Sequence, residues 1–206
     1  TTIPSPFLAG TKANERGHIV LLDPVGAGAS RLRTDTANRL MREVRFDAVR
    51  GNISEIKTLC IGSGTPTGVD ADAVDAVTES NLDDGVALVK AFAKQTGCII
   101  AVTGAIDLVS DGERCWCIRN GRAEMSRITG TGCQLSALTT AFLVANPEHK
   151  LEAAAAAVCM MGLAGEIGWA NMQPGDGNST YRNRIIDAIC NMTGDTLEEG
   201  AKYELR

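Results

Sequence analysis

The chain has 206 residues and a formal net charge of −5, with 44% hydrophobic and 22% charged residues. These values are typical of one large globular domain and exclude disordered, collagen-like and strongly basic chains. Since the balance is acidic and aromatic residues are few, we expect no nucleic-acid partner.

Seven cysteines are an odd number for a disulfide framework, and most stand in apolar runs, such as Cys98 in GCIIAV. We therefore expect reduced, buried thiols. The most apolar stretch, Ala153 to Gly165, is shorter than the ~20 residues of a membrane span. The start, TTIPSPFLAG, lacks the basic and apolar regions of a signal peptide. We expect a cytoplasmic chain without a membrane partner.

The first predicted strand is His18–Asp23, a run that ends in Pro24 and the glycine loop VGAGAS. A helix follows, for which Thr34 is a good N-cap. Phe46–Val49 is the next predicted strand, and it ends at Arg50-Gly51-Asn52. The helix prediction depends on apolar residues at the spacing of one helical face, namely Ala37, Leu40, Met41 and Val44.

From Leu59 to Asn81 the chain is rich in turns and acids, which predicts a surface excursion with at most a short helix. A helix over Leu82 to Gln95 is predicted to end at Gly97, and Cys98–Val102 is the next buried strand. The strands Ile106–Ser110 and Arg114–Arg119 then form a predicted hairpin around Asp111-Gly112.

The rest of the chain is predicted to be mostly helical. Its helices are Leu135 to Val144, Leu151 to Asn171, Arg182 to Met192, and one from Leu197 onwards. Strands and helices joined by glycine loops indicate an α/β fold with parallel strands. Because such sheets bind ligands beyond the carboxyl ends of their strands, the loops DPVGAG, RGN, VTG and ITGTGC are the candidate site.

ITGTGC places two glycines directly before a predicted helix, which can present backbone N–H groups to an anion. The candidate anion hole is Gly130, Thr131, Gly132 and Cys133. An ordinary glycine turn before a helix is an equally good interpretation of these residues. A thiol at a helix N-terminus is also more reactive than usual, although a buried core cysteine is the commoner case.

Asp23 follows one predicted strand, and Arg50, Asn52 and Glu55 follow another. Each polar residue alone could be a helix cap or a solvated charge. Together with the glycine loop they supply what phosphoryl transfer needs, which is a site for Mg²⁺, a cation for phosphates and N–H donors. The chain contains neither a P-loop nor a Rossmann glycine motif, and His18 and His149 lie far from the glycine loops.

Five motifs in this order resemble the hydroxyethylthiazole kinase family of the ribokinase-like superfamily. They are LDPVGAGAS, VRGNISEI, GVD, AVTGAIDLVSDG and ITGTGC, between Leu22 and Cys133. The resemblance implies a three-layer α/β fold, with a mostly parallel sheet flanked by helices, in a single kinase domain over residues 1–206. It also implies transfer of the ATP γ-phosphate to the hydroxyl of 4-methyl-5-(2-hydroxyethyl)thiazole in thiamin salvage.

Carried over by motif, Arg50, Asn52 and Thr103 fall on positions that bind ATP. Asp23 and Glu55 fall on the acids near Mg²⁺, and Gly130 falls on a position that contacts the substrate. Cys133 falls on the catalytic position, where sugar kinases of the superfamily have an aspartate. That aspartate would instead favour a sugar kinase, a hydroxymethylpyrimidine kinase or an NAD(P)H-hydrate dehydratase.

A non-catalytic assembly subunit of this fold is the alternative from a different class. The resemblance also implies a homotrimer with its site at a subunit boundary. The thiazole-binding Met and the asparagine-rich segment of the family have no counterpart here, so we expect the natural chain to extend upstream by at least a strand and a helix. The tail GDGNSTYRNRIIDAI also departs from the expected G-x-G-S-[FY] turn.

Overall fold

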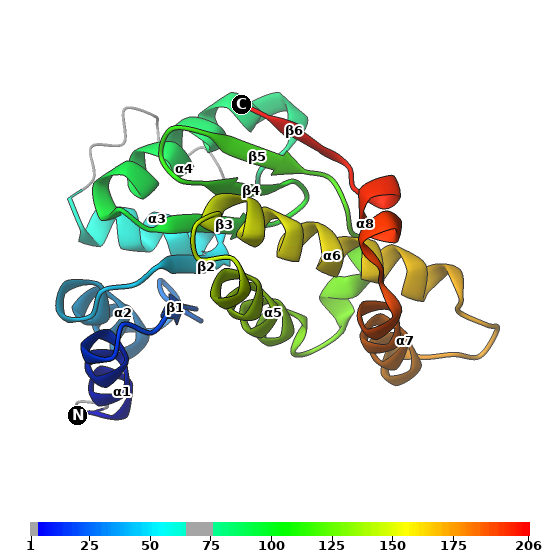
Figure 1. The fold of residues 1–206 in the computed structure, drawn as a ribbon, viewed down its shortest axis with the longest axis horizontal. Helices are drawn as coiled ribbons and strands as arrows, with labels where there is room; N and C mark the ends of the chain where they lie inside the picture. The colour runs from blue at the N-terminus through cyan, green and yellow to red at the C-terminus, as the bar shows by residue number, and fades with distance from the viewer. Residues whose placement is uncertain (1–3, 65–75) are drawn as a thin grey trace. The chain divides into compact units, whose positions relative to one another are not determined.

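The computed structural model describes residues 4–64 and 76–206, which Figure 1 draws in colour. The chain divides into two compact units. Unit 1 comprises residues 1–115 together with Arg206, and unit 2 comprises residues 116–205. The GVD motif and most of the predicted surface excursion lie outside the described residues. Each unit is described by itself below.

The strands of unit 1 build a mixed sheet in the order β1-β2-β3-β4. The pairs β1–β2 and β2–β3 are parallel, whereas β3–β4 is antiparallel. The prediction of an α/β fold is therefore confirmed, with parallel pairing at β1 to β3. The bounds are β1 Leu21–Leu22, β2 Ala48–Asn52, β3 Ile99–Thr103 and β4 Asp107–Ser110.

Helices of unit 1 pack on this sheet and on one another. α3 contacts β2 and β3, α4 contacts β3 and β4, and α2 packs between α1 and α3. α4 ends as predicted at Gly97, whose φ of 68° is the left-handed conformation that favours glycine. The helices are α1 Pro4–Glu15, α2 Arg31–Glu43, α3 Ile53–Gly62, the 3-10 turn η2 Glu79–Asn81, and α4 Leu82–Thr96.

Three local predictions in unit 1 are wrong. The N-cap of α2 is Ser30, and Thr34 lies within the first turn, where its hydroxyl donates to the Ser30 carbonyl at 2.9 Å. The strand predicted over Phe46–Val49 is β2, which begins two residues later, at Ala48, and runs three residues further, to Asn52. The surface excursion predicted from Leu59 starts too early, because α3, which Asn52 caps, runs to Gly62 and buries Leu59 and Cys60.

Unit 2 is mainly helical, as predicted, and also contains an antiparallel pair of strands. In this pair β5, which begins at the last residue of unit 1, places Cys117 opposite Glu204 of β6. The sequence reading missed β6. The elements are β5 Cys115–Ile118, the 3-10 segment η3 Ala123–Arg127, α5 Thr131–Ala145, α6 Lys150–Ala170, α7 Asn178–Asn191, α8 Gly194–Gly200 and β6 Tyr203–Leu205.

Helix α6 forms the centre of unit 2 and contacts α5, α7 and α8. The apolar stretch Ala153 to Gly165 was expected to be too short to span a membrane, but the helix that contains it has 21 residues, so its length is sufficient. Among the described helices it alone is long and apolar enough to do so, yet 67% of its apolar window is buried inside the protein. A mostly buried helix of this kind is typical of the core of a soluble protein.

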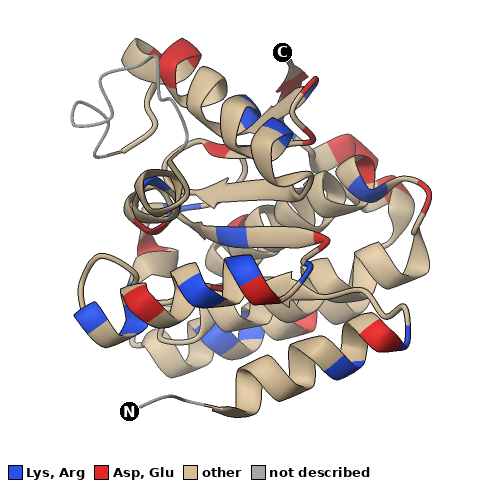
Figure 2. Ribbon diagram, turned by 90° about the vertical axis from the view of Figure 1, so that its left-hand side faces the viewer, with Lys and Arg blue, Asp and Glu red and all other residues tan. Residues whose placement is uncertain are grey.

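Charged residues of both signs are interspersed along the helices (Figure 2). Several of them pair within one helix, as Arg39 and Glu43 do at 2.6 Å in α2. Such exposed pairs contribute little to stability, because solvent screens their attraction. The strands of unit 1 are mostly apolar, so the polar side chains at their carboxyl ends stand out.

Candidate active site

Arg50 lies at the centre of the candidate site in unit 1. Its Nη1 atom is 3.2 Å from Asp23 Oδ2, and its Nη2 donates to Thr103 Oγ1 at 2.9 Å. The side chains of Arg50 and Asp23 are only 12% and 17% exposed. A guanidinium held on two sides in a partly buried place keeps one orientation, which suits recognition of a phosphate.

The sheet register explains why these residues meet. In the parallel pair β2–β3, Arg50 lies opposite Ala101 and Asn52 lies opposite Thr103. Side chains two residues apart along a strand share a face, so Arg50, Asn52 and Thr103 are on one face near the ends of their strands. The predicted grouping at this edge of the sheet is thus present in unit 1.

Glu55 connects two loops of the site through hydrogen bonds to backbone groups. Its Oε1 accepts from Gly26 N and its Oε2 from Asn52 N, both at 2.9 Å. Asn52 Oδ1 in turn accepts from Glu55 N at 2.8 Å, which completes a capping box at the start of α3. Glu55 therefore fixes the glycine loop after β1 against the β2–α3 junction.

The loop that Glu55 holds needs glycine at two positions. Gly26 and Gly28 have φ of 75° and 88°, in the left-handed region that residues with a Cβ rarely adopt. A Cβ at Gly28 would also lie 2.7 Å from Thr58 Oγ1. The glycines thus let the loop turn tightly beside α3.

The carboxylates of Asp23 and Glu55 fit a metal ion that keeps its waters. Each oxygen that accepts an N–H has a second lone pair, and Mg²⁺ gives up its hydration shell reluctantly. Within the described ranges, no group of three His, Cys, Asp or Glu side chains could hold a metal ion by itself. Water and the phosphates of a nucleotide would have to complete the coordination.

A cavity of about 350 Å³ opens at this end of β2 and β3. Thr103, which contacts Arg50, is part of its wall, and so is Asn52 of the capping box. The lining residues are Asn52, Ile53, Ser54, Ala76, Val77, Val102, Thr103 and Gly104. A ligand in this cavity would lie next to Asn52 and Thr103, two of the residues that the sequence analysis assigned to ATP.

The ITGTGC loop belongs to unit 2 and leads into α5. Gly130 is the N-cap residue with φ of 98°, and among the described residues no atom lies within 4 Å of a Cβ built on it. Thr131, Gly132 and Cys133 form the first turn of the helix, where backbone N–H groups lack partners within the helix. This geometry has the form of an anion hole.

The cysteine prediction is correct for five of the seven thiols. In the described part of the chain, which includes every cysteine, none forms a disulfide. Cys133 and Cys190 are exposed rather than buried. The exposure of Cys133 contradicts the alternative in which it is a core residue and leaves its thiol accessible to a substrate.

The sequence reading missed one polar residue of this site, Asp107 at the start of β4. Its Oδ1 accepts from Gly104 N at 2.8 Å. Burial raises the pKa of Asp107 to about 7, although the Gly104 N–H and the charge of Arg50 both act to lower it. The signal that could have found it is the TG-x-x-D spacing, in which an aspartate closes the turn that follows a threonine.

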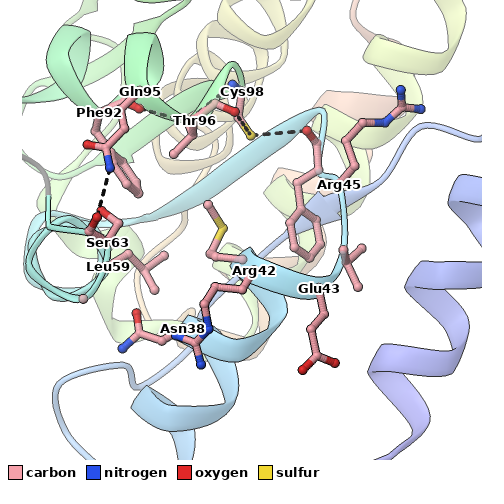
Figure 3. Close-up of a pocket in the computed structure, with 14 residues that line it drawn as sticks. Asn38, Arg42, Glu43, Arg45, Leu59, Ser63, Phe92, Gln95, Thr96 and Cys98 are labelled. Atoms are coloured by element: carbon pink, nitrogen blue, oxygen red, sulfur yellow. Dashed lines mark hydrogen bonds between the residues drawn. The ribbon is translucent and has the colours of Figure 1, made fainter.

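A larger cavity, of about 550 Å³, lies at the amino ends of strands β2 and β3 in unit 1, away from the candidate site (Figure 3). Its wall includes Phe46 before β2, Cys98 before β3 and the last turns of α2, α3 and α4. Figure 3 shows the hydrogen bond from Gln95 to the Ser63 carbonyl, which joins two parts of this wall. The thiol of Cys98 donates to the Phe46 carbonyl at 3.2 Å. Because helix C-termini repel anions, this cavity does not suit a nucleotide.

Solved structures define the class of the fold. The structure of a hydroxyethylthiazole kinase protein from Pyrococcus horikoshii OT3 matches with a TM-score of 0.82 and 28% identity, covering 97% of this chain and 70% of that chain. A pyridoxal kinase from Staphylococcus aureus matches with a TM-score of 0.58 and 21% identity, over 97% of this chain and 66% of that one, which shows the fold alone. The fold is that of the ribokinase-like α/β kinases.

Sequence comparison narrows this class to one family. The model of the Hydroxyethylthiazole kinase family matches residues 2–195. The hydroxyethylthiazole kinase of Clostridium acetobutylicum is 50% identical over 98% of this chain and 74% of its own length, and that of Ruminiclostridium cellulolyticum is 41% identical over 98% and 71%. The chain belongs to the hydroxyethylthiazole kinase family.

Proposed function

We propose that this protein transfers the γ-phosphate of ATP to the hydroxyl of 4-methyl-5-(2-hydroxyethyl)thiazole, a step of thiamin salvage. Family membership supports the substrate. The observation that carries the proposal is the guanidinium of Arg50, which Asp23 and Thr103 hold in place beside a cavity. A fixed cation of this kind stabilises the charge on a transferring phosphoryl group.

In this proposal Arg50, Asn52 and Thr103 bind ATP from unit 1. The N–H groups of the Gly130–Cys133 turn receive the transferring phosphoryl group. The substrate hydroxyl oxygen forms a bond to the γ-phosphorus while the bond from that phosphorus to the β,γ-bridging oxygen breaks, which leaves ADP. Cys133, acting as a thiolate, accepts the hydroxyl proton late and becomes a thiol, because phosphoryl transfer proceeds through a loose transition state. Gly130 contacts the thiazole alcohol.

Asp23 and Glu55 would hold Mg²⁺ through its waters, and the ion would neutralise charge on the phosphates. Both carboxylates also have a structural function, which their hydrogen bonds define. Asp23 orients Arg50, and Glu55 holds the Gly26 loop against the start of α3. We propose Mg²⁺ as the ion because water-mediated carboxylates suit its coordination.

The proposal extends to the assembly and the setting of the enzyme. We propose a homotrimer with its site at a subunit boundary, a cytoplasmic location and a single kinase domain over residues 1–206. Sedimentation of the purified protein tests the trimer, which requires a mass three times the 21.7 kDa of the chain. A monomer that is fully active would contradict a shared site.

An acceptor panel tests the proposed reaction. ADP release is measured with ATP, Mg²⁺ and either the thiazole alcohol, hydroxymethylpyrimidine or pyridoxal, and product mass identifies the phosphorylated compound. We expect the highest kcat/KM with the thiazole alcohol. A preference for hydroxymethylpyrimidine, or ADP-dependent dehydration of NAD(P)H hydrate in a separate assay, would instead support another ribokinase-like activity. No ADP release with any acceptor would support the non-catalytic assembly subunit.

A further inference from the structure

The turn from β3 to β4 borders the cavity at the carboxyl ends of the strands. The antiparallel register places Val102 opposite Leu108, so it continues to Thr103 opposite Asp107. Directly opposed residues of an antiparallel pair project to the same face. Asp107 therefore lies on the face from which Thr103 contacts Arg50.

The side chain of Asp107 stabilises the wall of the cavity through a hydrogen bond. Thr103 and Gly104 both line the cavity, and the carboxylate of Asp107 accepts the Gly104 N–H at 2.8 Å. This bond closes the three-residue connection between the strands. It fixes the Gly104 backbone and, through the chain, the position of the Thr103 hydroxyl.

Gly104 leaves room for a ligand to approach this turn closely. Its φ is not positive, and the nearest described atom to a Cβ built on it is the Ile106 carbonyl oxygen at 3.8 Å. Neither backbone conformation nor packing among the described residues thus requires glycine here. Glycine has a conformational cost, which is offset where another molecule must approach the backbone.

We propose that Asp107 is a positioning residue of the nucleotide site, holding Thr103 and Gly104 through the Gly104 N–H in the arrangement that receives the phosphates of ATP. This inference rests on the proposed function, which places ATP beside Arg50 and Thr103. A carboxyl oxygen accepts this N–H whether the acid is ionised or protonated. Asp107→Asn therefore keeps the acceptor, and Asp107→Ala removes it.

Asp111 offers a matched control in the next turn of the same unit. Its Oδ1 accepts from Glu113 N at 2.9 Å and from Arg114 N at 2.8 Å, so it also closes a turn with a carboxylate. This turn follows Ser110, which pairs with Ile100 near the start of β3 and so lies away from the candidate site. Asp111→Ala removes the same kind of contact without touching the cavity.

The experiment compares the parent, Asp107→Ala, Asp107→Asn and Asp111→Ala by the KM for ATP, the KM for the thiazole alcohol and the Tm. Asp107→Ala is expected to raise the KM for ATP by about fivefold to tenfold, the effect of one lost hydrogen bond, with the thiazole KM unchanged. Asp107→Asn should stay within about twofold of the parent. Asp111→Ala should lower the Tm and leave the KM for ATP unchanged.

Three outcomes would overturn the inference. They are an unchanged ATP KM in Asp107→Ala, an equal rise of both KM values, and an Asp107→Asn variant as impaired as Asp107→Ala. If Asp107→Ala does not fold, the affinity of Gly104→Ala for ADP is measured instead. An affinity of this variant for ADP equal to that of the parent then overturns the proposal. A parent that binds ADP but phosphorylates no thiazole alcohol would refute the proposed function, and ADP affinity would still test Asp107.

Discussion

Replacing Glu55 with glutamine tests how the site holds its loops and its metal. The two carboxylate oxygens accept from Gly26 N and Asn52 N. A glutamine side chain has one oxygen and one NH₂ group, so one of these two N–H groups must face a donor. Losing one hydrogen bond to a charged group, and leaving an N–H without an acceptor, costs ~1–3 kcal/mol.

The low end of this range applies, because Glu55 is only half-buried and Asn52 is exposed. We expect a loss of about 1 kcal/mol, which lowers the Tm by about 2–4 °C for a chain of this size. The magnesium concentration for half-maximal rate should rise as well, and by more than the KM for the thiazole alcohol. Thermal melts and magnesium titrations of the initial rate measure both quantities.

Glu43→Gln is the control, since Glu43 is paired with Arg39 on the exposed face of α2. It should melt with the parent and leave the magnesium curve unchanged, because an exposed ion pair contributes little to stability. The reasoning about the loop is refuted if Glu55→Gln melts with the parent. The metal role is refuted if the variant melts lower but its magnesium curve overlays that of the parent.

Three further predictions concern the other polar groups. Cys133→Ala should lower kcat by ~10²-fold and Cys133→Asp should preserve turnover; a phosphate on Cys133 in the intact mass of the parent would contradict a base role. Arg50→Lys should raise the KM for ATP by about tenfold, because an ammonium cannot replace the planar guanidinium between Asp23 and Thr103; an unchanged KM in steady-state kinetics would refute this. Since burial raises the pKa of Asp107 to about 7, the parent loses stability as the pH rises between the unfolded value of about 4 and the folded one. Urea melts should therefore show that the free energy of unfolding of Asp107→Asn, relative to that of the parent, increases by on the order of 1–2 kcal/mol from about pH 5 to pH 8. A difference between the two proteins that does not change with pH would contradict this prediction.

The order of elements was predictable where a regular apolar pattern meets a clear end signal. α4 is the best case, because its apolar face and Gly97 both mark its end. Boundaries failed where one residue serves two elements. Asn52 ends a strand and caps a helix, so the polar run Arg50-Gly51-Asn52 resembled a loop.

The site was predictable in part, because the rule on strand ends gathers Asp23, Arg50 and Thr103 without knowledge of any contact. What the sequence could not supply is how the carboxylates are used. Glu55 has the pattern of a metal ligand, yet both of its oxygens accept backbone N–H groups from separate segments. β6 was missed for a similar reason, since a three-residue strand depends on a partner far away in the sequence.

Phosphorus NMR of one reaction mixture tests the central claim most directly. The purified protein is incubated with ATP, Mg²⁺ and 4-methyl-5-(2-hydroxyethyl)thiazole, with mixtures lacking the thiazole or the protein as controls. The account predicts that a phosphate monoester resonance and ADP appear in equal amounts, and only in the complete mixture. Intact ATP, or ADP accompanied only by inorganic phosphate, would contradict it.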